Sequence, residues 1–250
     1  DIALRTLREG RGDPLLLLHG FGADTTVWRA FVGQLGAANP LLALDLPGHG
    51  RSAGVAAADF DALVAAVESA LAEAGVQRLH LCGHSLGGAV AAALAGRGGL
   101  DLRSLTLLAP AGLGPEIDGA FIAGFCRATR TETLRAWLRR LVHDPAMVPE
   151  ALVRAAVAAH DDPAIRDGHD GVAGALFPEG TQVFSVRAHL DAYAGPCRVI
   201  WGRDDRILPL RQAEGLPGRV ALHRFADLGH LPQVEAPAEV AALLDQTVRS

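Results

Sequence analysis

Apolar residues follow two patterns along this chain, short continuous runs and stretches with helical spacing. The continuous runs predict strands buried on both faces of a parallel sheet, and a loosely alternating run at the N-terminus predicts an edge strand. Helical spacing predicts amphipathic helices between the strands, and this alternation indicates βαβ units and a mostly parallel sheet. The predicted strands are 2–7, 15–18, 40–46, 79–82, 102–108, 197–201 and 220–225, and the predicted helices are 24–38, 59–74, 89–95 and 237–248.

The alternation of strands and helices stops after the strand at 102–108. From there to about Tyr193 the pattern predicts helices at 120–127, 131–141 and 149–159, without a strong strand. We interpret this stretch as a helical insertion over the carboxyl edge of the sheet, where α/β proteins bind ligands. The expected organisation is an α/β core of residues 1–110 and 194–250 with a helical cap, or lid, at 111–193.

Histidines and aspartates occur together at two places in this predicted cap, at 160–162 and 169–170. Neither place has a known metal-ligand spacing, and the surrounding sequence is polar and contains Gly and Pro. We therefore expect a solvated loop there and no metal site.

The composition narrows the classes of function. The length of 250 residues allows one large domain with a sizeable core, and the net charge of −5 provides no basic surface for nucleic acid. No apolar run is long enough to span a bilayer, and no signal-peptide pattern opens the chain. The three cysteines are scattered without metal-ligand spacing, which suits a reducing compartment. These features predict a cytoplasmic protein with neither nucleic-acid nor membrane partners.

The chain contains no lysine, because all 23 of its basic residues are arginine. A Walker-type phosphate loop, a Schiff-base enzyme and a lipoylated or biotinylated carrier segment each require a lysine. None of these can lie within the chain.

A serine stands between the predicted strand at 79–82 and the predicted helix at 89–95, in the sequence Gly83-His84-Ser85-Leu86-Gly87. This G-x-S-x-G pattern suits a sharp strand-to-helix turn, where small residues let neighbouring segments approach. The serine hydroxyl would stand at the carboxyl edge of the sheet, beside helix N–H groups that favour developing negative charge. The pattern therefore predicts a nucleophilic serine.

A serine nucleophile needs a base and a group that orients the base, expected at later strand ends in the order serine, acid, histidine. The turn after 197–201 carries Asp204 and Asp205, and the turn after 220–225 carries Asp227 and His230. Asp205 followed by His230 fits the order. The turn after 102–108 offers only Ala-Pro-Ala-Gly.

At these positions the chain resembles the α/β-hydrolase-fold superfamily over essentially its whole length. The resemblance implies a mostly parallel central sheet flanked by helices, with a helical cap inserted after the sixth strand of the fold. In the family's W-G-x-x-D pattern the acid falls on Asp205, and the oxyanion hole falls on the backbone N–H groups of Phe21 and Leu86. The matching segments are His19-Gly20-Phe21-Gly22, Asp45-Leu46-Pro47-Gly48-His49-Gly50-Arg51-Ser52, Gly83-His84-Ser85-Leu86-Gly87-Gly88, Trp201-Gly202-Arg203-Asp204-Asp205 and Gly229-His230.

Residues 105–119 and 200–209 are similar to the α/β-hydrolase-type domain of the acetyltransferase (E2-like) subunit of acetoin dehydrogenase complexes. This resemblance implies acetyl transfer between dihydrolipoamide and coenzyme A, both as substrates, with no metal or organic cofactor. In that subunit a lipoyl domain comes first. Since this chain holds no lysine, either a lipoyl domain precedes residue 1 and the protein joins a 2-oxo acid or acetoin dehydrogenase-type complex, or the chain is a stand-alone relative.

Four further residues are candidates for contact with a small-molecule acyl substrate. His84 is expected to pack beside the serine turn, where it could also touch substrate. Phe121, Phe125 and Trp137 could line an acyl pocket or form the core of the insertion itself.

The sequence thus predicts a serine-dependent hydrolase or acyltransferase that works through an acyl-enzyme on Ser85. The alternatives are a stand-alone carboxylesterase or C–C bond hydrolase of the same fold, and a non-catalytic binding protein. Dehalogenases and epoxide hydrolases of this fold use aspartate where this chain has Ser85. C–C bond hydrolases usually carry asparagine where this chain has His84, which disfavours them.

Overall fold

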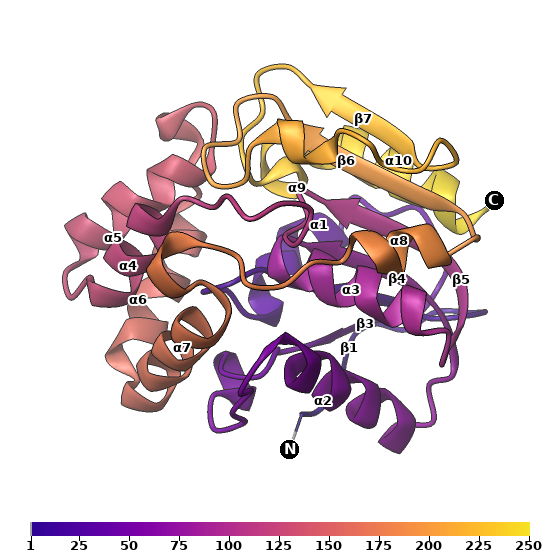
Figure 1. Cartoon of the computed structure of the whole chain (residues 1–250), viewed down its shortest axis with the longest axis horizontal. Coiled ribbons are helices and arrows are strands. Elements are labelled where there is room, and N and C mark those ends of the chain that lie inside the picture. Colours follow the sequence, from indigo (N-terminus) through magenta and orange to yellow (C-terminus); the bar gives the residue numbers. More distant parts are fainter. Residues whose placement is uncertain (1) are drawn as a thin grey trace.

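A seven-stranded, mostly parallel sheet forms the centre of the computed structural model, which describes residues 2–250 (Figure 1). The strand order is β1-β3-β2-β4-β5-β6-β7, and β1 pairs antiparallel with β3 while the other neighbours are parallel. This confirms the predicted fold class. The strands are β1 (Arg5–Arg8), β2 (Leu15–Leu18), β3 (Leu41–Leu44), β4 (Arg78–His84), β5 (Asp101–Leu108), β6 (Cys197–Gly202) and β7 (Ala221–Phe225).

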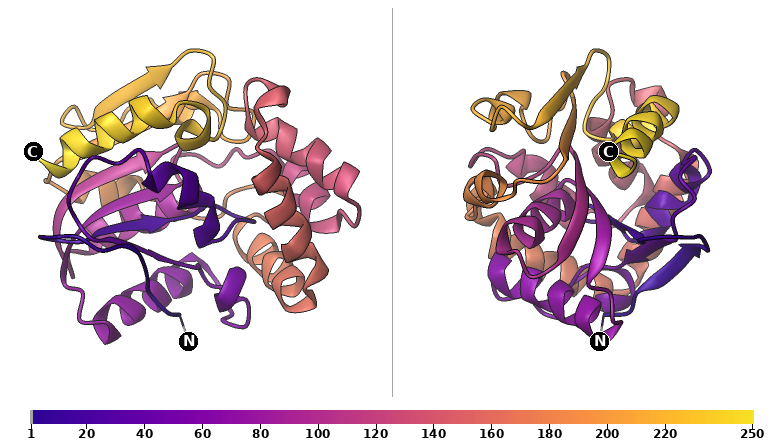
Figure 2. Two further views of the ribbon diagram at one scale, coloured as in Figure 1. Left: turned by 180° about the vertical axis from the view of Figure 1, so that it is seen from behind. Right: turned by 90° about the vertical axis from the view of Figure 1, so that its right-hand side faces the viewer.

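Each face of the sheet is covered by helices, which explains why β2 and β3 are apolar throughout. In β2, Leu16 and Leu18 pack into the larger core cluster, whereas Leu15 and Leu17 pack into a second cluster on the opposite face. All four leucines are fully buried. The first face carries α2 (Phe60–Glu73), α3 (Leu86–Arg97) and α8 (Arg187–Ala192), and the second carries α1 (Arg29–Val32), α9 (Pro232–Glu235) and α10 (Pro237–Val248), as Figure 2 shows from behind.

The helix expected over 24–38 is much shorter in the structure. It consists of a 3₁₀ turn at Thr25–Trp28 followed by α1 at Arg29–Val32. The backbone beyond α1 is held instead by Asp245 of α10, whose carboxylate accepts a hydrogen bond from the N–H of Gly36 at 2.8 Å. A contact with a distant helix therefore replaces the intrahelical hydrogen bonds that the apolar spacing suggested.

Four of the helices between β5 and β6 stand over the carboxyl ends of the strands, and together they are called the cap here (Figure 1). The cap was expected after the sixth strand, but these helices follow β5, the fifth strand of this chain. A single strand, β1, precedes the parallel series here. The next helix along the chain, α8, packs against α3 instead. The cap helices are α4 (Gly119–Arg127), α5 (Thr131–Leu138), α6 (Glu150–Asp161) and α7 (Pro163–Leu176).

The solvated loop expected around 160–170 is wrong, because this stretch is helical. Asp162 caps α7 by accepting from the N–H of Ala164 at 2.9 Å, and Pro163 occupies its first turn, where proline is favoured. His160 and His169 point inward and are buried. The ring nitrogens of His160 lie 2.8 Å from the carbonyl oxygens of Ala156 and Phe125, so this side chain joins α6 to α4.

Short 3₁₀ turns complete the described chain. Among residues 2–250, no helix combines the length and the apolar composition that crossing a bilayer requires. The remaining turns are Gly50–Ser52, Arg139–Leu141, Pro145–Met147, Pro178–Gly180 and Leu210–Ala213.

Candidate active site

Ser85 lies at the turn between β4 and α3 with φ 52° and ψ −117°, a backbone conformation that a residue with a Cβ rarely adopts. The turn is tight on both sides. A Cβ on Gly83 would lie 2.2 Å from the carbonyl oxygen of Gly87, and a Cβ on Gly87 would lie 2.4 Å from that of His19. The two glycines are therefore required by close backbone approach, and the strain at Ser85 is held by its surroundings.

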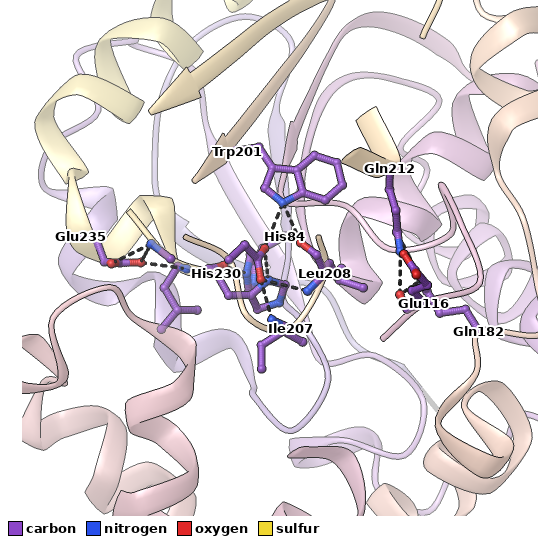
Figure 3. A network of polar contacts seen from close by, with 12 residues as sticks. His84, Glu116, Gln182, Trp201, Ile207, Leu208, Gln212, His230 and Glu235 are labelled. Carbon is purple, nitrogen blue, oxygen red and sulfur yellow. Dashed lines mark hydrogen bonds and ion pairs between the residues drawn. The ribbon is translucent and has the colours of Figure 1, made fainter. Parts of the chain in front are cut away.

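Asp205 and His230 form a buried pair in the loops that follow β6 and β7 (Figure 3). The Nδ1–H of His230 donates to Asp205 Oδ2 at 2.7 Å, and both side chains are almost fully excluded from solvent. Asp204, the other acid considered in this turn, faces outward and pairs with His143 at 2.9 Å. Of the two neighbouring acids, the structure thus brings Asp205 to the histidine.

The carboxylate of Asp205 is surrounded by donors. Its Oδ2 also accepts from Trp201 Nε1–H at 3.0 Å, and its Oδ1 accepts from the backbone N–H groups of Ile207 and Leu208 at 2.8 and 2.9 Å (Figure 3). Hydrogen bonds of this kind stabilise the ionised carboxylate and fix its direction. The acid is therefore oriented before any substrate arrives.

His84, the residue before Ser85, supports His230. Its Nε2–H donates to the carbonyl oxygen of His230 at 2.7 Å, and the two rings lie 4.9 Å apart between centroids. Burial lowers the pKa of His84 well below its ordinary value. Because His84 is consequently neutral near pH 7, it does not repel positive charge that develops on the neighbouring imidazole.

The loop after β2 approaches Ser85 closely. A Cβ on Gly20 would lie 3.1 Å from the Cβ of Ser85, so glycine lets the following residue, Phe21, come near the nucleophile. His19 fixes this loop, because its Nδ1 bonds the carbonyl of Gly20 at 2.8 Å and its Nε2 accepts from the N–H of Leu46 at 3.0 Å. Leu86 begins α3, where N–H groups have no intrahelical partner. Backbone donors from both segments can thus serve an oxyanion beside Ser85.

A cavity of about 50 Å³ encloses Ser85 and His230 between the core and the cap. Its polar side chains are the serine, this histidine and His84, and none of its lining residues is charged. The remaining lining residues are Gly20, Phe21, Gly22, Ala23, Val27, Ile117, Phe121, Ile122, Phe125, Leu138, Leu141, Leu152, Phe177, Ile207 and Leu231.

The predicted substrate-contact residues divide into two groups. His84, Phe121 and Phe125 line the cavity, and the two phenyl rings stack with centroids 5.7 Å apart. Trp137 lies behind α4 instead, where its indole packs edge-on against Phe121 and would collide with a Cβ on Gly124.

Sequence reasoning missed two kinds of residue at this site. Phe177 lies after α7, outside any periodic stretch, and it lines the cavity only because the cap folds over the sheet. Glu235 lies five residues after His230, and its carboxylate accepts hydrogen bonds from the backbone on both sides of that histidine. A single acid after a Gly-His pair carries no sequence signal that separates it from a solvated side chain.

One group of side chains within residues 2–250 has the geometry to hold a metal ion. The ligand atoms of His143, Asp204 and Asp227 lie within 4.8 Å of one another, and the two aspartates follow β6 and β7. Both aspartates are exposed, and the arrangement around Ser85 can polarise a carbonyl group without a metal.

Relatives with curated functions match most of this chain. It is 34% identical over 230 residues to the dihydrolipoyllysine-residue acetyltransferase component of the acetoin cleaving system of Pseudomonas putida, covering 92% of this chain and 61% of that protein. The chain thus spans about three fifths of the length of this relative. It is also 30% identical over 254 residues to the 2-hydroxymuconate semialdehyde hydrolase of Pseudomonas sp. strain CF600, covering 94% of this chain and 86% of the hydrolase.

The fold is shared with solved structures. A meta-cleavage product hydrolase from Pseudomonas fluorescens IP01 superposes with a TM-score of 0.84 at 22% identity, covering 99% of this chain and 94% of the hydrolase. A family model described as "Alpha/beta hydrolase family" matches residues 15–243. The strained serine turn, the mostly parallel sheet and these matches agree, and the chain belongs to the alpha/beta hydrolase family.

Proposed function

We propose that this protein transfers a small, neutral acyl group, acetyl in the first instance, through an acyl-enzyme on Ser85 to a thiol acceptor. The observation that carries the proposal is the buried Asp205–His230 pair, whose histidine lines the same small cavity as a strained serine. A nucleophile, a base and an oriented acid at one point are what acyl transfer requires.

In the first half of the proposed reaction, Ser85 Oγ attacks the carbonyl carbon of the acyl donor and His230 Nε2 takes the hydroxyl proton. Asp205 keeps the proton on Nδ1 and stabilises the imidazolium. The N–H groups of Phe21 and Leu86 bind the tetrahedral oxyanion, each contributing about 3–4 kcal/mol to transition-state stabilisation. The intermediate collapses, and the leaving group departs with the proton from His230.

In the second half, His230 takes the proton of the acceptor thiol, whose sulfur attacks the acyl carbon. The second tetrahedral intermediate breaks the bond to Ser85 Oγ, which recovers its proton from His230. A thioester leaves and the free enzyme is restored. Water in place of the thiol would give hydrolysis through the same groups.

The size and charge of the cavity support a small, neutral acyl group. A volume of about 50 Å³ accommodates roughly three to five water-sized atoms, and an acetyl group has three heavy atoms. The lining contains no charged side chain, so a buried carboxylate on the acyl group would have no cationic partner and would be strongly disfavoured.

The relative from Pseudomonas putida supports acetyl as the acyl group and a lipoyl thiol as one reactant, since it is an acetyltransferase component that acts on a dihydrolipoyllysine residue. A lipoyl group is attached to lysine, and this chain has none. The dihydrolipoamide would therefore be presented by another segment or another protein, as in a multienzyme complex, and coenzyme A would be the second thiol.

The competition between thiol and water tests this proposal. With p-nitrophenyl acetate as donor, dihydrolipoamide or coenzyme A is expected to accelerate turnover saturably and to accumulate as its acetyl thioester, measured by chromatography. Release of acetate alone, at a rate that thiols leave unchanged, would contradict transfer and favour a carboxylesterase. Turnover of 2-hydroxymuconate semialdehyde by C–C cleavage would favour the activity of the hydrolase relatives. A folded protein whose Ser85 is inert to a fluorophosphonate would indicate a non-catalytic binding protein.

The cavity also predicts how the enzyme selects acyl chains. Wild-type kcat/KM for p-nitrophenyl acetate is expected to exceed that for the hexanoate by at least about 10-fold, because each methylene that does not fit costs about 1–3 kcal/mol. Phe121→Ala removes a ring from the cavity wall, and it should raise the hexanoate-to-acetate ratio of kcat/KM by about 10-fold.

Phe184→Ala is the matched control, since Phe184 stacks on Phe60 with ring centroids 4.2 Å apart and does not line the cavity. This variant should leave the ratio unchanged. An equal preference for both esters in the wild-type enzyme would contradict an acetyl-sized cavity.

A further inference from the structure

The carboxylate of Glu235, at the end of α9, joins two segments that are far apart in sequence. It accepts from the N–H of Gly229 at 2.9 and 3.0 Å and from the N–H of Leu231 at 3.2 Å, on either side of His230. It also accepts from the N–H of His143 in the cap at 2.7 Å. One side chain thus satisfies three backbone donors from the cap and from the loop of His230.

A second set of contacts connects the same two segments. The N–H of His230 itself donates to the carbonyl of Leu141 at 2.7 Å. A Cβ on Gly229 would lie 2.8 Å from the backbone nitrogen of His143, so the loop and residues 141–143 touch backbone to backbone. We call residues 141–143 the cap segment. The hydrogen bond from His230 to Leu141 joins the cap segment to the loop directly, and Glu235 bridges the two a second time, so displacement of one segment must displace the other.

The cap segment also reaches the loop of Asp205. The ring of His143 pairs with Asp204 at 2.9 Å, next to the acid that orients His230. Both side chains are about two-fifths exposed, so this pair contributes little by itself. The partly buried backbone contacts through Glu235 are the stronger connection between the cap and the loops of Asp205 and His230.

We propose that Glu235 is a positioning residue that fixes the imidazole of His230 and makes its alignment depend on the cap. The inference rests on the proposed function and adds to it a residue that acts through His230. A carboxylate suits this place because its oxygens only accept hydrogen bonds, and all of its partners here are backbone N–H donors. Glutamine would direct an N–H group toward at least one backbone N–H, and the loop would move until that donor found another partner.

The variants Glu235→Gln and Glu235→Asp test the proposal, with Glu239→Gln as the matched control. Glu239 is an exposed glutamate of α10, four residues along the chain. Three quantities are measured: the rate at which a fluorophosphonate labels Ser85, by intact-protein mass spectrometry; the low-field proton resonance of the His230 Nδ1–H bond to Asp205; and the thermal unfolding midpoint.

Glu235→Gln is expected to label about 10- to 100-fold more slowly than wild type, as misplacement of a catalytic group by about 1 Å does, and to broaden the His230 resonance. Glu235→Asp keeps the carboxylate and should recover part of the rate. Glu239→Gln should stay within about twofold of wild type.

A folded Glu235→Gln protein with the wild-type labelling rate and an unchanged His230 resonance would overturn the proposal. Failure of both Glu235 variants to fold would also overturn it, by assigning Glu235 a purely structural role. Failure of the wild-type protein to react with the probe would instead contradict the proposed function.

Discussion

Replacement of Ser85 by alanine is expected to abolish acyl-enzyme formation and to lower kcat for p-nitrophenyl acetate by up to about 10⁶-fold, as loss of a serine nucleophile does elsewhere. His230 then has no hydroxyl to deprotonate, and the donors at Phe21 and Leu86 can only assist direct attack by water. The fold should survive, because alanine has the same Cβ as serine in the turn at φ 52°. The measurements are the steady-state rate and fluorophosphonate labelling.

Ser69→Ala is a suitable control for the serine substitution. Ser69 is exposed on α2, where its hydroxyl donates to Glu73 at 3.1 Å. The control should label at the wild-type rate. Undiminished labelling or turnover in the Ser85→Ala protein would remove this serine from the mechanism.

Asp205→Asn is expected to lower kcat by about 10⁴-fold while the protein remains folded. An asparagine amide whose oxygen accepts from Ile207 and Leu208 must turn its NH₂ group toward His230 and Trp201. The imidazole would then present an unprotonated Nδ1 and carry its proton on Nε2, where the serine needs an acceptor. The indole N–H loses its carboxylate acceptor and keeps the carbonyl of Leu208 at 3.2 Å, so we expect a stability loss of about 1–3 kcal/mol as well.

The neighbouring acid provides the control for this substitution. Asp204→Asn changes an exposed side chain paired with a partly exposed histidine, so kcat should change by no more than about threefold. Rates measured across pH for both variants separate loss of the base from loss of substrate affinity. If the Asp204 variant were the impaired one, the assignment of the orienting acid would be wrong.

The serine turn and the loops that carry Asp205 and His230 could be predicted because short sequence motifs mark them. Gly83 is required by close approach to the backbone of Gly87, four residues along the chain, and such a contact leaves a fixed spacing in the sequence. The order of Ser85, Asp205 and His230 follows from strands whose carboxyl ends meet at one edge of the sheet. Apolar runs identified those strands because both faces of the sheet are covered.

The helix α7 could not be identified from composition, because its exposed face carries Asp167, Asp170 and Gly171 while its buried face includes a histidine. The helix predicted over 24–38 was too long for the opposite reason. Its apolar spacing is real, since Trp28 and Phe31 are buried, but Asp245 binds the backbone of the last residues and ends the helix early. In this second stretch a tertiary contact outweighed local propensity.

The shape of the cavity could not be predicted at all. From the sequence, Phe121 and Phe125 could either line a pocket or belong to the core of the cap. The structure places both at the cavity wall and Trp137 behind them. Which rings face Ser85 depends on how the cap lies on the sheet. The contacts of Glu235 could not be predicted for the same reason, because its partners are His143 in the cap and Gly229 and Leu231 beside His230.

The central claim, a covalent intermediate on Ser85, is tested most directly by rapid mixing with p-nitrophenyl acetate followed by acid quenching and mass spectrometry. We predict a burst of p-nitrophenol equal to the enzyme concentration, together with one acetyl group that peptide mapping places on Ser85. A thiol added before quenching should remove the acetyl group. Steady turnover of the ester with Ser85 unmodified at every quench time would contradict the account.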